Sequence, residues 1–256
     1  MSIEDDDIGR ALADICEAAA AEILPLWRSG LAVSHKADES PVTEADRRGE
    51  ALILAALAAR WPDIPVISEE DASEFGTPVA IGPRFFLVDP LDGTKAFVRG
   101  DPSFTVNIGL VVNGAPVAGA VSAPPTGETW FTAKAGCRKR PSGGDDIAVR
   151  VRPWLKGGAV ALVSHTLNAA SLRALQTQYG FDVIHAMDSS IKLCRVAEGA
   201  ADLYPRVGPT MEWDTAAGHA VLAAAGGVLT QPDGTAFLYG KADRGFRNGD
   251  FVARGG

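Results

Sequence analysis

The sequence predicts an α+β protein in two packed parts, and three observations support this fold class. Near the N-terminus, apolar residues recur at helical spacing in two long stretches. The middle of the chain changes to short β-rich runs that are separated by turn residues. Towards the C-terminus, strand patterns alternate with helical ones. We therefore expect residues 1–145 to form an α+β subdomain with mostly antiparallel strands, and residues 146–256 to form an α/β subdomain.

Two helices are predicted before the first long strand. Residues 7–29 combine good helix formers with apolar residues at helical spacing, and Pro25 is expected to bend or end this helix. A polar loop follows. Thr43 to Asp46 then resembles an N-terminal cap with acidic residues in the first turn of a second helix. A Trp-Pro pair closes that second helix, and the run PVI is expected to form a short strand.

The strand region begins at Arg84. RFFLVD, FTVNIGLVV and PVAGAVSAP are predicted strands, with Asn113-Gly114 as a turn signal, and TGETWFTAKAG predicts another hairpin. Residues 138–146 contain proline, paired glycines and mixed charge, which makes them the best candidate for a linker. Beyond them, the predicted strand AVALVS is followed by predicted helices in LNAASLRALQTQYG, SSIKLCRVAEG and TAAGHAVLAAAGG.

Composition limits the classes of function. The chain has 256 residues and is 46% hydrophobic, so it can bury a large core. Its formal net charge of −8 argues against binding to a nucleic acid polymer or to an anionic membrane surface. A small anionic substrate is still compatible with this charge, because a bound metal ion can reverse the local sign.

The cysteines and the hydropathy pattern indicate the compartment. Cys16, Cys137 and Cys194 are far apart and lack CxxC spacing, which fits a reducing environment and predicts neither a disulfide framework nor a thiolate metal site. The acidic start of the chain is unlike a secretory signal, and no apolar run approaches the roughly 20 residues of a spanning helix. We expect a cytoplasmic protein without a transmembrane segment. Peripheral association with the inner face of the membrane and the choice between monomer and homodimer are left open.

The segment LVDPLDGT, residues 87–94, places two carboxylates at the end of an expected buried strand. Hard divalent cations such as Mg²⁺ take carboxylate and carbonyl oxygens as ligands. Asp89, Asp92 and an outward-facing Leu91 carbonyl could supply such ligands. Gly93 lets the following amides approach an anion, and a helix starting at Thr94 would present them to a phosphate. The alternative is an ordinary turn, since Asp, Pro and Gly are turn residues.

The spacing of the two aspartates argues against one class of phosphatase. Enzymes that attack phosphate with an aspartate carry DxDx[TV], in which both carboxylates lie on the same side of an extended strand end. The interval in this sequence is one residue longer. A covalent aspartyl-phosphate intermediate is therefore not expected.

Four further acids stand at the ends of predicted elements. Glu69 and Glu70 follow a short apolar strand, and their alternative interpretation is an exposed acidic turn. Asp214 precedes an alanine-rich helix, and Asp46 stands near another helix start, so each could be a helix cap. Because the acids occupy similar settings without a salt-bridge pattern, together they favour a metal site more strongly than each does alone.

These motifs together resemble a known family. The sequence is similar to the lithium-sensitive, metal-dependent phosphatases of the inositol monophosphatase superfamily, and within it to the bacterial CysQ-type 3′(2′),5′-bisphosphate nucleotidases. The matching stretches occur in the family's order over positions 36–252. They are KADESPVTEAD, VISEED, LVDPLDGTKAF, FTVNIGLV, SSIKLCRVAEGAADLYPRVGPTMEWDTAAGHAVLAAAGG and GFRNGDFVA.

The resemblance implies a layered αβαβα sandwich with a metal cleft between two subdomains. Matched position by position, Glu69, Asp89, Asp92 and Asp214 are the expected carboxylate ligands of two or three Mg²⁺ ions, with the Leu91 carbonyl as a further ligand. The first subdomain would hold most of these ligands. The second would add Asp214 and residues on the substrate side.

The resemblance also implies catalytic roles. Asp46 and Thr94 match the pair that orients and activates the attacking water, and Glu70 would lie beside the first metal and support its water. Gly93 and Thr94 match the amides that hold the phosphate. The expected substrate-binding residues are Glu69, Leu91, Asp92, Gly93, Thr94, Ser190, Lys192 and Asp214.

The nucleotidase branch is favoured by Lys95 and Phe97 in DGTKAF and by SSIKLC, where Ser190 and Lys192 are expected to meet the nucleotide or its second phosphate. Ser164 and His165 resemble a motif near the substrate, although a lone histidine at a strand end is more often structural. The sequence departs from the family twice. Ala96 stands where glutamate is usual, and Asp188 stands where glycine is usual, so that a carboxylate could repel a phosphate or recruit a cation.

The resemblance implies a Mg²⁺-dependent phosphatase that hydrolyses the 3′-phosphate of adenosine 3′,5′-bisphosphate to AMP and phosphate with a metal-activated water. Such an enzyme would be inhibited by lithium and would clear a by-product of sulfate assimilation. The first alternative is an inositol or sugar phosphatase of the same fold. A non-catalytic metal- or nucleotide-binding protein is a third hypothesis, and the complete set of acids argues against it.

Overall fold

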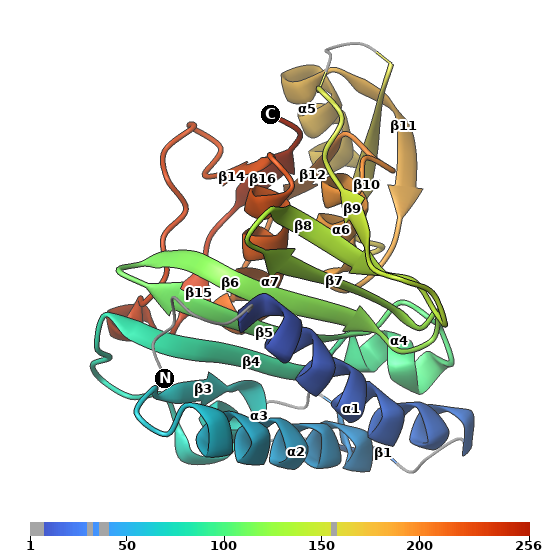
Figure 1. The fold of residues 1–256 in the computed structure, drawn as a ribbon. Helices are drawn as coiled ribbons and strands as arrows, with labels where there is room; N and C mark the ends of the chain where they lie inside the picture. The colour runs from blue at the N-terminus through green and yellow to red at the C-terminus, as the bar shows by residue number, and fades with distance from the viewer. Residues whose placement is uncertain (1–7, 30–32, 36–40, 155–157) are drawn as a thin grey trace.

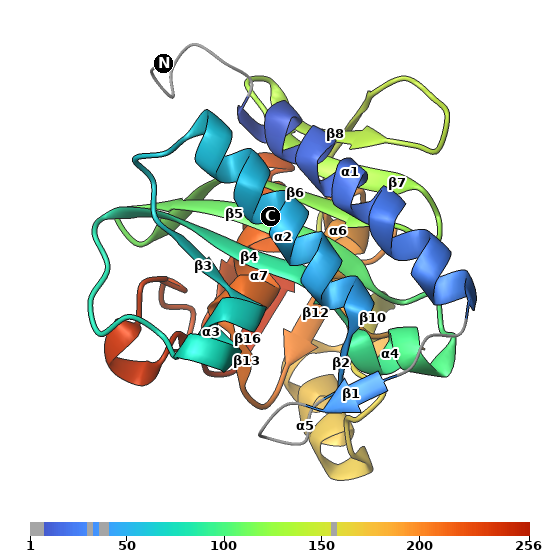
Figure 2. The same ribbon diagram turned by 90° about the horizontal axis from the view of Figure 1, so that it is seen from below.

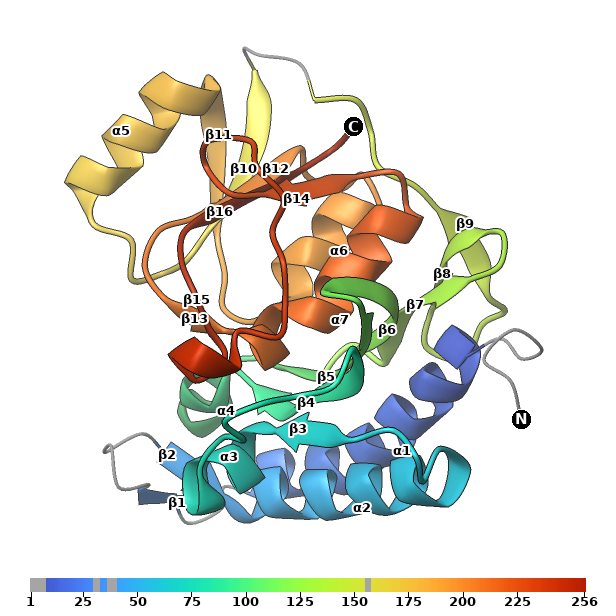
Figure 3. The same ribbon diagram turned by 90° about the vertical axis from the view of Figure 1, so that its left-hand side faces the viewer.

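The computed structural model describes residues 8–29, 33–35, 41–154 and 158–256, and these form alternating layers of helix and sheet (Figure 1). Helices α1 (Ile8–Ser29) and α2 (Glu44–Arg60) cover one face of a seven-stranded sheet. Helices α6 (Ile191–Ala197) and α7 (Glu212–Ala224) lie between this sheet and a five-stranded sheet (Figure 3). Helix α5 (Ala169–Tyr179) packs on the second sheet. The predicted αβαβα sandwich is confirmed.

Helix α1 forms because its apolar residues line one face. Leu12, Cys16 and Ile23 are buried at helical spacing against the seven-stranded sheet. Pro25 lies inside the helix, which continues to Ser29, so the expectation that Pro25 could end it is wrong. The polar loop predicted to follow lies partly outside the described residues. In its described parts, β1 (Val33–His35) pairs with β2 (Pro41–Thr43) in antiparallel fashion, although a loop was expected here.

Helix α2 begins at the predicted cap. The Thr43 hydroxyl accepts a hydrogen bond from Ala45 N at 3.1 Å, and Asp46 Oδ2 accepts one from Thr43 N at 2.7 Å. This reciprocal pattern is a capping box, which satisfies amides that have no partner within the helix. Trp61 caps the other end, as predicted (Figure 2 shows α1 and α2 side by side). The capping box also fixes the position of the Asp46 carboxylate.

The seven-stranded sheet runs in the order β3-β4-β5-β6-β7-β8-β9. Strand β3 is parallel to β4, and every later pairing is antiparallel, in agreement with the prediction for this part of the chain. The strands are β3 (Val66–Ser68), β4 (Arg84–Asp92), β5 (Thr105–Val112), β6 (Ala115–Ala123), β7 (Glu128–Ala133), β8 (Gly136–Arg140) and β9 (Ile147–Val149).

The segment proposed as a linker, residues 138–146, lies within the last hairpin of this sheet. Strand β8 extends to Arg140, and β9 pairs with it in antiparallel fashion, so residues 141–146 form the connection of a hairpin. The charged residues of the segment stabilise this hairpin, because Arg140 Nε donates to Asp146 Oδ1 at 2.8 Å. The division of the chain at residues 145 and 146 stays a prediction.

The five-stranded sheet runs in the order β11-β10-β12-β16-β14, with parallel pairs around β10 and antiparallel pairs around β16. Its strands are β10 (Ala159–Val163), β11 (Phe181–Ala186), β12 (Leu203–Arg206), β14 (Val228–Thr230) and β16 (Phe251–Arg254). The remaining elements are α3 (Glu69–Phe75), α4 (Thr94–Arg99), the paired strands β13 (Thr210–Met211) and β15 (Arg247–Asn248), and a 3₁₀ turn, Ala242–Arg244. Among the described residues, no helix has the length and apolar character needed to span a bilayer.

Small residues allow α7 to approach the seven-stranded sheet closely. A Cβ atom added to Gly109 on β5 would lie 2.8 Å from Ala217 N, and one added to Gly119 on β6 would lie 2.8 Å from Ala217 O. The helix in turn presents Ala216 and Ala217, which are fully buried or nearly so. This contact holds α7, and with it Asp214, at a fixed distance from the end of β4.

We expect Gly109→Ala to lower the free energy of unfolding by about 1–3 kcal/mol, because the added methyl group forces α7 away from the sheet. Gly82→Ala is the matched control, since a Cβ there has no heavy atom within 4 Å among the described residues. Urea unfolding of both variants measures the difference. Equal stability of the two variants would contradict the close approach of α7.

Candidate active site

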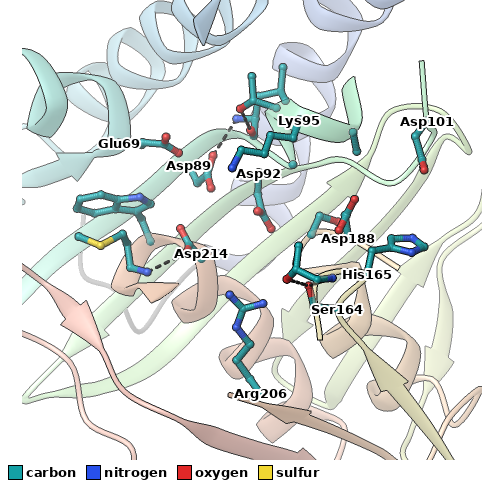
Figure 4. Close-up of a pocket in the computed structure, with 18 of the residues that line it drawn as sticks. Glu69, Asp89, Asp92, Lys95, Asp101, Ser164, His165, Asp188, Arg206 and Asp214 are labelled. Carbon is teal, nitrogen blue, oxygen red and sulfur yellow. Dashed lines mark hydrogen bonds between the residues drawn. The ribbon is translucent and has the colours of Figure 1, made fainter. Parts of the chain in front are cut away.

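A cavity of about 930 Å³ opens beside the end of β4, and both halves of the chain line it (Figure 4). Its charged lining residues fall into six carboxylates and three basic side chains. The carboxylates are Glu69, Asp89, Asp92, Asp101, Asp188 and Asp214, and the basic residues are Lys95, Arg99 and Arg206. Figure 4 shows Glu69, Asp89 and Asp214 on one side of the cavity, with Asp188 and His165 on the other.

Three of these carboxylates form a compact cluster. Glu69, Asp89 and Asp214 each offer an oxygen, and these oxygens lie within 4.8 Å of one another. Carboxylate oxygens in this arrangement suit a hard divalent cation. The three residues come from α3, β4 and α7, so the cluster exists only when the two parts of the chain are packed together.

Strand pairing brings Glu69 and Asp89 together. Strands β3 and β4 are parallel, and Ser68 lies opposite Val88 in their register. The next residue of each chain is therefore Glu69 or Asp89, and both emerge at the same end of the sheet. A pairing between strands separated by a helix is not readable from short motifs, yet it decides which acids meet.

The turn predicted in LVDPLDGT is a bulge at the end of β4. Asp89 lies opposite Asn107 and Asp92 opposite Thr105, so β4 holds one residue more than β5 over this interval. Leu91 N donates to Asp89 Oδ1 at 2.9 Å, which fixes the carboxylate of Asp89. The Leu91 carbonyl accepts a hydrogen bond from Thr94 Oγ1 at 3.1 Å, and its role as a metal ligand stays a prediction.

Asp92 lies near the cluster but faces a different set of groups. Its Oδ2 accepts a hydrogen bond from Ser190 N in the second half of the chain. Burial raises the pKa of Asp92 from 3.8 to about 6, although the charges of Lys192 and Arg206 act in the opposite direction. Asp92 therefore joins the two halves of the cavity through a backbone amide.

Burial and mutual repulsion disfavour the ionised form of the aspartates in the three-acid cluster. Burial raises the pKa of Asp89 well above its usual value, and the charges of Glu69, Asp92 and Asp214 raise it further. Burial likewise raises the pKa of Asp214, with Asp92 and Glu69 as the main repelling charges. A divalent cation would relieve both effects, because it neutralises the carboxylates and replaces their lost hydration.

Asp214 stands inside a helix rather than before one. Helix α7 begins at Glu212, two residues ahead of Asp214, and Asp214 Oδ2 accepts a hydrogen bond from Met211 N at 2.8 Å. The expected position before the helix is therefore corrected by two residues. The carboxylate does satisfy an amide at the helix start, as the capping interpretation requires, and it also faces the cavity.

Asp46 and Thr94 meet, as the resemblance implied. Asp46 is buried, its Oδ2 accepts from the Thr43 amide and hydroxyl, and its Oδ1 lies 3.3 Å from Thr94 Oγ1. Gly93 precedes Thr94 in a left-handed conformation with φ of 98°, which favours glycine, and a Cβ there would meet Ser103 O at 2.8 Å. Thr94 thus starts α4 with its hydroxyl at the cavity wall.

Glu50 is a supporting residue that sequence reasoning missed. It is buried on α2, one turn after Asp46, and its Oε1 accepts hydrogen bonds from Glu70 N at 3.1 Å and Asp71 N at 3.3 Å. Glu50 therefore caps α3, the helix whose first residue is Glu69. The spacing of Asp46 and Glu50, four residues apart on one helix face, is the signal that could have found it.

Glu70 lies next to the cluster but is not among the residues that line the cavity in the described part of the chain. It is half-buried, and its amide is held by Glu50 as described above. Its expected support of a metal-bound water stays a prediction.

Ser190 and Lys192 lie behind the cavity wall. Both are buried, and neither is among the lining residues of the described chain. Ser190 Oγ lies 2.6 Å from Asn107 Oδ1 and 2.9 Å from Thr105 Oγ1. Lys192 Nζ donates to the carbonyls of the turn that carries Asp188. Their side chains support the wall from behind, and the substrate contact expected for them stays a prediction.

The other residues that carry the resemblance also fall into two groups, those that line the cavity and those that pack behind it. Lys95, Ser164 and His165 line the cavity. Phe97 instead packs into the core against Phe104, with ring centroids 5.2 Å apart. The ring of Phe97 therefore anchors α4 to the core and does not face the cavity.

Arg206 is a second residue that sequence reasoning missed. It stands at the end of β12 and lines the cavity. Its Nε is buried and has no hydrogen-bond partner within the described part of the chain. Arg206 is half-buried, and its Nη2 donates to Pro209 O at 3.3 Å. A guanidinium that lines a cavity is suited to an anionic group of a ligand. The stretch LYPR carries no signal for this role, because an arginine that ends a strand is as often exposed.

Together the fold and the cavity define a class of protein: a layered αβαβα protein that gathers carboxylates between its two sheets. Known proteins identify the family within this class. The model of the inositol monophosphatase family matches residues 5–250. The chain therefore belongs to the inositol monophosphatase family.

Two relatives and one solved structure show which proteins the chain is similar to. The 3′(2′),5′-bisphosphate nucleotidase CysQ of Escherichia coli K12 is 44% identical over 196 residues, which cover 76% of this chain and 77% of the relative. Histidinol-phosphatase of Mycobacterium tuberculosis is 32% identical over 249 residues, covering 94% and 92%. The crystal structure of CysQ from Bacteroides thetaiotaomicron matches with a TM-score of 0.75 at 33% identity and covers 96% of both chains. The predicted resemblance to the CysQ-type branch is confirmed.

We expect Glu50→Ala to raise the Mg²⁺ concentration for half-maximal thermal stabilisation about tenfold, because α3 loses its cap and Glu69 its support. Glu50→Gln, which keeps an oxygen acceptor, should change it much less. Thermal unfolding at a series of Mg²⁺ concentrations measures the effect, and unfolding without Mg²⁺ reports the purely structural cost. Unchanged Mg²⁺ dependence in a folded Glu50→Ala variant would remove Glu50 from this role.

We also expect Mg²⁺ to stabilise the protein more at pH 7.5 than at pH 5. The raised carboxylate pKa values mean that the folded protein binds protons more tightly than the unfolded chain. Without a cation, stability therefore falls as pH rises from about 4 through 6 and beyond. A cation reverses this loss, and protons compete with it at low pH. The rise in Tm on adding Mg²⁺ checks this at both pH values, and an equal rise at both would contradict it.

Proposed function

We propose that this protein is a Mg²⁺-dependent phosphatase that hydrolyses the 3′-phosphate of adenosine 3′,5′-bisphosphate to AMP and phosphate. The observation that carries the proposal is the meeting of the three-acid cluster with the Asp46–Thr94 pair at one cavity. The 44% identity to a protein named 3′(2′),5′-bisphosphate nucleotidase supports the choice of substrate. A cytoplasmic location and a role in sulfate assimilation are part of the same proposal.

The residues present fit Mg²⁺. Glu69, Asp89 and Asp214 supply oxygen atoms close enough to share an ion, and Asp92 and the Leu91 carbonyl are proposed to complete sites for two or three ions. The donors are all oxygen, as a hard cation prefers, and no cysteine lines the cavity within the described chain. Bound Mg²⁺ supplies Lewis-acid polarisation of the phosphate and lowers the pKa of a coordinated water. Lithium inhibition is expected because Li⁺ can occupy such a site without supplying this chemistry.

Asp46 and Thr94 are proposed to activate the attacking water. Asp46 Oδ2 is engaged by Thr43, which leaves Oδ1 for the hydroxyl of Thr94. When Thr94 donates its proton to Asp46, the lone pairs of its oxygen can accept a proton from a water on the cavity side. The proton leaves the water for Thr94, and the hydroxyl proton of Thr94 moves to Asp46. Glu70 is proposed to support the same water from α3.

The phosphate is proposed to lie against the amides of Gly93 and Thr94 at the start of α4. The left-handed backbone of Gly93, which glycine adopts without strain, and its close approach to Ser103 O fix the position of these amides. Glu69, Leu91, Asp92 and Asp214 would hold the cations, which would supply positive charge to the phosphate. A net negative protein thereby binds a polyanion, because acids hold cations and cations hold phosphate.

The rest of the nucleotide is proposed to occupy the opposite side of the cavity. His165 offers a ring on that side, and Lys95 and Arg206 add positive charge elsewhere in the cavity lining. Ser190 and Lys192 belong to this substrate site indirectly, since Ser190 N bonds to Asp92 and Lys192 holds the turn before α6. The cavity volume of about 930 Å³ lies within the range of cavities that hold drug-sized ligands.

The second candidate is a phosphatase of the same fold that acts on a monophosphate, such as an inositol or sugar phosphate. The observation that favours it is the 32% identity over 94% of the chain to a protein named histidinol-phosphatase. That relative shows that one family member of similar length carries the name of a different phosphatase.

A phosphate-release assay with Mg²⁺ separates these candidates. We expect kcat/KM for adenosine 3′,5′-bisphosphate to exceed those for inositol 1-phosphate, fructose 1,6-bisphosphate and histidinol phosphate at least tenfold. Equal or faster hydrolysis of inositol 1-phosphate or histidinol phosphate would reject the nucleotide substrate and leave the hydrolytic mechanism in place.

Thr94→Ala tests the water-activating pair. We expect kcat to fall at least a hundredfold, which lies within the range for loss of a general acid–base group, while the Mg²⁺ concentration needed for half-maximal stabilisation changes less than threefold. Thr94→Ser keeps the hydroxyl and should retain most of the activity. Unchanged turnover in Thr94→Ala would exclude Thr94 from the chemical step.

A further inference from the structure

A salt bridge between Arg99 and Asp188 forms part of the cavity lining. Arg99 Nη2 lies 2.7 Å from Asp188 Oδ2, and both residues line the cavity. Arg99 ends α4, while Asp188 lies in the turn before α6, so the pair joins segments that are 89 positions apart in the chain. In Figure 4, Asp188 lies on the side of the cavity away from Glu69. The pair therefore lies on the side of the cavity opposite the three-acid cluster.

The turn that carries Asp188 is rigidly held. Lys192 Nζ donates to Met187 O at 3.0 Å and to Ser189 O at 2.5 Å, and these carbonyls flank Asp188. Ser189 adopts a left-handed backbone with φ of 57°, and Ser190 N bonds to Asp92. The carboxylate of Asp188 is consequently presented to Arg99 from a fixed backbone.

The pair adds little to stability. The side chain of Arg99 is 53% exposed and that of Asp188 is 21% exposed, and ion pairs of this kind contribute about 0–1 kcal/mol. The pair matters more for the net charge of the cavity than for the stability of the fold. Six carboxylates face three basic side chains there, and two divalent cations would bring the cavity close to neutral. One unit of charge at the substrate end is then as large as the net charge of the whole cavity lining.

We propose that Asp188 determines specificity: by pairing with Arg99 it withholds a cation from the second phosphate of a bisphosphate substrate. This inference rests on the proposed function. Asp188, which stands where the family usually has glycine, neither repels a phosphate nor recruits a metal ion while Arg99 neutralises it. An uncharged residue at this position leaves the guanidinium of Arg99 free to attract a dianion. Asp188 thus moderates the preference for bisphosphates over monophosphates.

Calorimetric binding of AMP and of adenosine in the presence of Mg²⁺ isolates the second phosphate, because AMP is the product that retains it. We expect Asp188→Asn to bind AMP roughly three- to tenfold more tightly than wild type, the effect of one screened unit charge. Arg99→Gln leaves Asp188 unpaired and should bind AMP roughly three- to tenfold more weakly. Adenosine affinity should change less than twofold in both variants.

The double variant Arg99→Gln/Asp188→Asn removes both charges and should bind AMP within twofold of wild type. Arg48→Gln is the matched control, because Arg48 is 52% exposed, pairs with Glu44 at 2.9 Å and lies outside the cavity lining. It should leave AMP affinity unchanged. A double variant that binds AMP as weakly as Arg99→Gln would overturn the proposal, since Arg99 would then act as a direct ligand whatever stands at position 188.

The ratio of kcat/KM for adenosine 3′,5′-bisphosphate to that for adenosine 3′-phosphate should rise in Asp188→Asn and fall in Arg99→Gln. Shifts below twofold, or shifts in the same direction, would reject the role of Asp188. Failure of wild type to hydrolyse the bisphosphate would instead reject the proposed function. In that case the AMP binding results still decide whether Asp188 restrains Arg99.

Discussion

The repulsion among buried carboxylates is the constraint on which the rest of this structure depends. Glu69, Asp89 and Asp214 are brought to within a few ångströms of one another, where burial and like charge both oppose ionisation. The backbone holds the acids in place in a consistent way. Asp89, Asp92, Asp214 and Asp46 each accept a hydrogen bond from a backbone amide, donated by Leu91, Ser190, Met211 and Thr43 respectively.

These hydrogen bonds explain how carboxylates that repel one another keep fixed orientations. An amide occupies one side of each carboxylate and fixes its orientation, so that other lone pairs remain for a cation or a proton. Packing behind the acids adds to this order. Glu212, the fully buried first residue of α7, accepts hydrogen bonds from Gly240 N at 2.7 Å and Lys241 N at 3.0 Å, which ties the start of α7 to a distant loop. The acids are therefore preorganised before any cation binds.

The layered architecture follows from the same requirement. Asp214 reaches the end of β4 only because α7 lies directly on glycine residues of β5 and β6. On the other face of the sheet, α2 presents Asp46 towards Thr94 and Glu50 towards α3. A helix layer on each face of one sheet thus brings side chains to the same strand end, and the bulge in β4 turns two aspartates towards them.

Local features of this fold could be predicted from the sequence, and long-range pairings could not. The cap formed by Thr43 and Asp46 was readable because its partners are three residues apart. The parallel pairing of β3 with β4 and the hydrogen bonds of Glu50 depend on register between distant segments. Asp188 was recognised as unusual, but its partner Arg99 is 89 positions away and no periodicity connects the two.

The resemblance to a family predicted some of the long-range pairings that local patterns do not. It identified Asp46 and Thr94 as a pair 48 positions apart, which no short-range rule predicts. It did not reveal that Ser190 and Lys192 are turned into the protein, because a matched position carries no information on side-chain direction. Arg206 was overlooked for the opposite reason: nothing in LYPR distinguishes a cavity arginine from one exposed at a strand end.

The central claim is that the acids hold cations and the cations hold phosphate. Calorimetric titration of inorganic phosphate into the protein, with Mg²⁺ and then with the cation removed by EDTA, tests this claim directly. The account predicts saturable phosphate binding with Mg²⁺ and no resolved binding without it, since six carboxylates would then repel the anion. Phosphate binding of equal affinity under both conditions would contradict it.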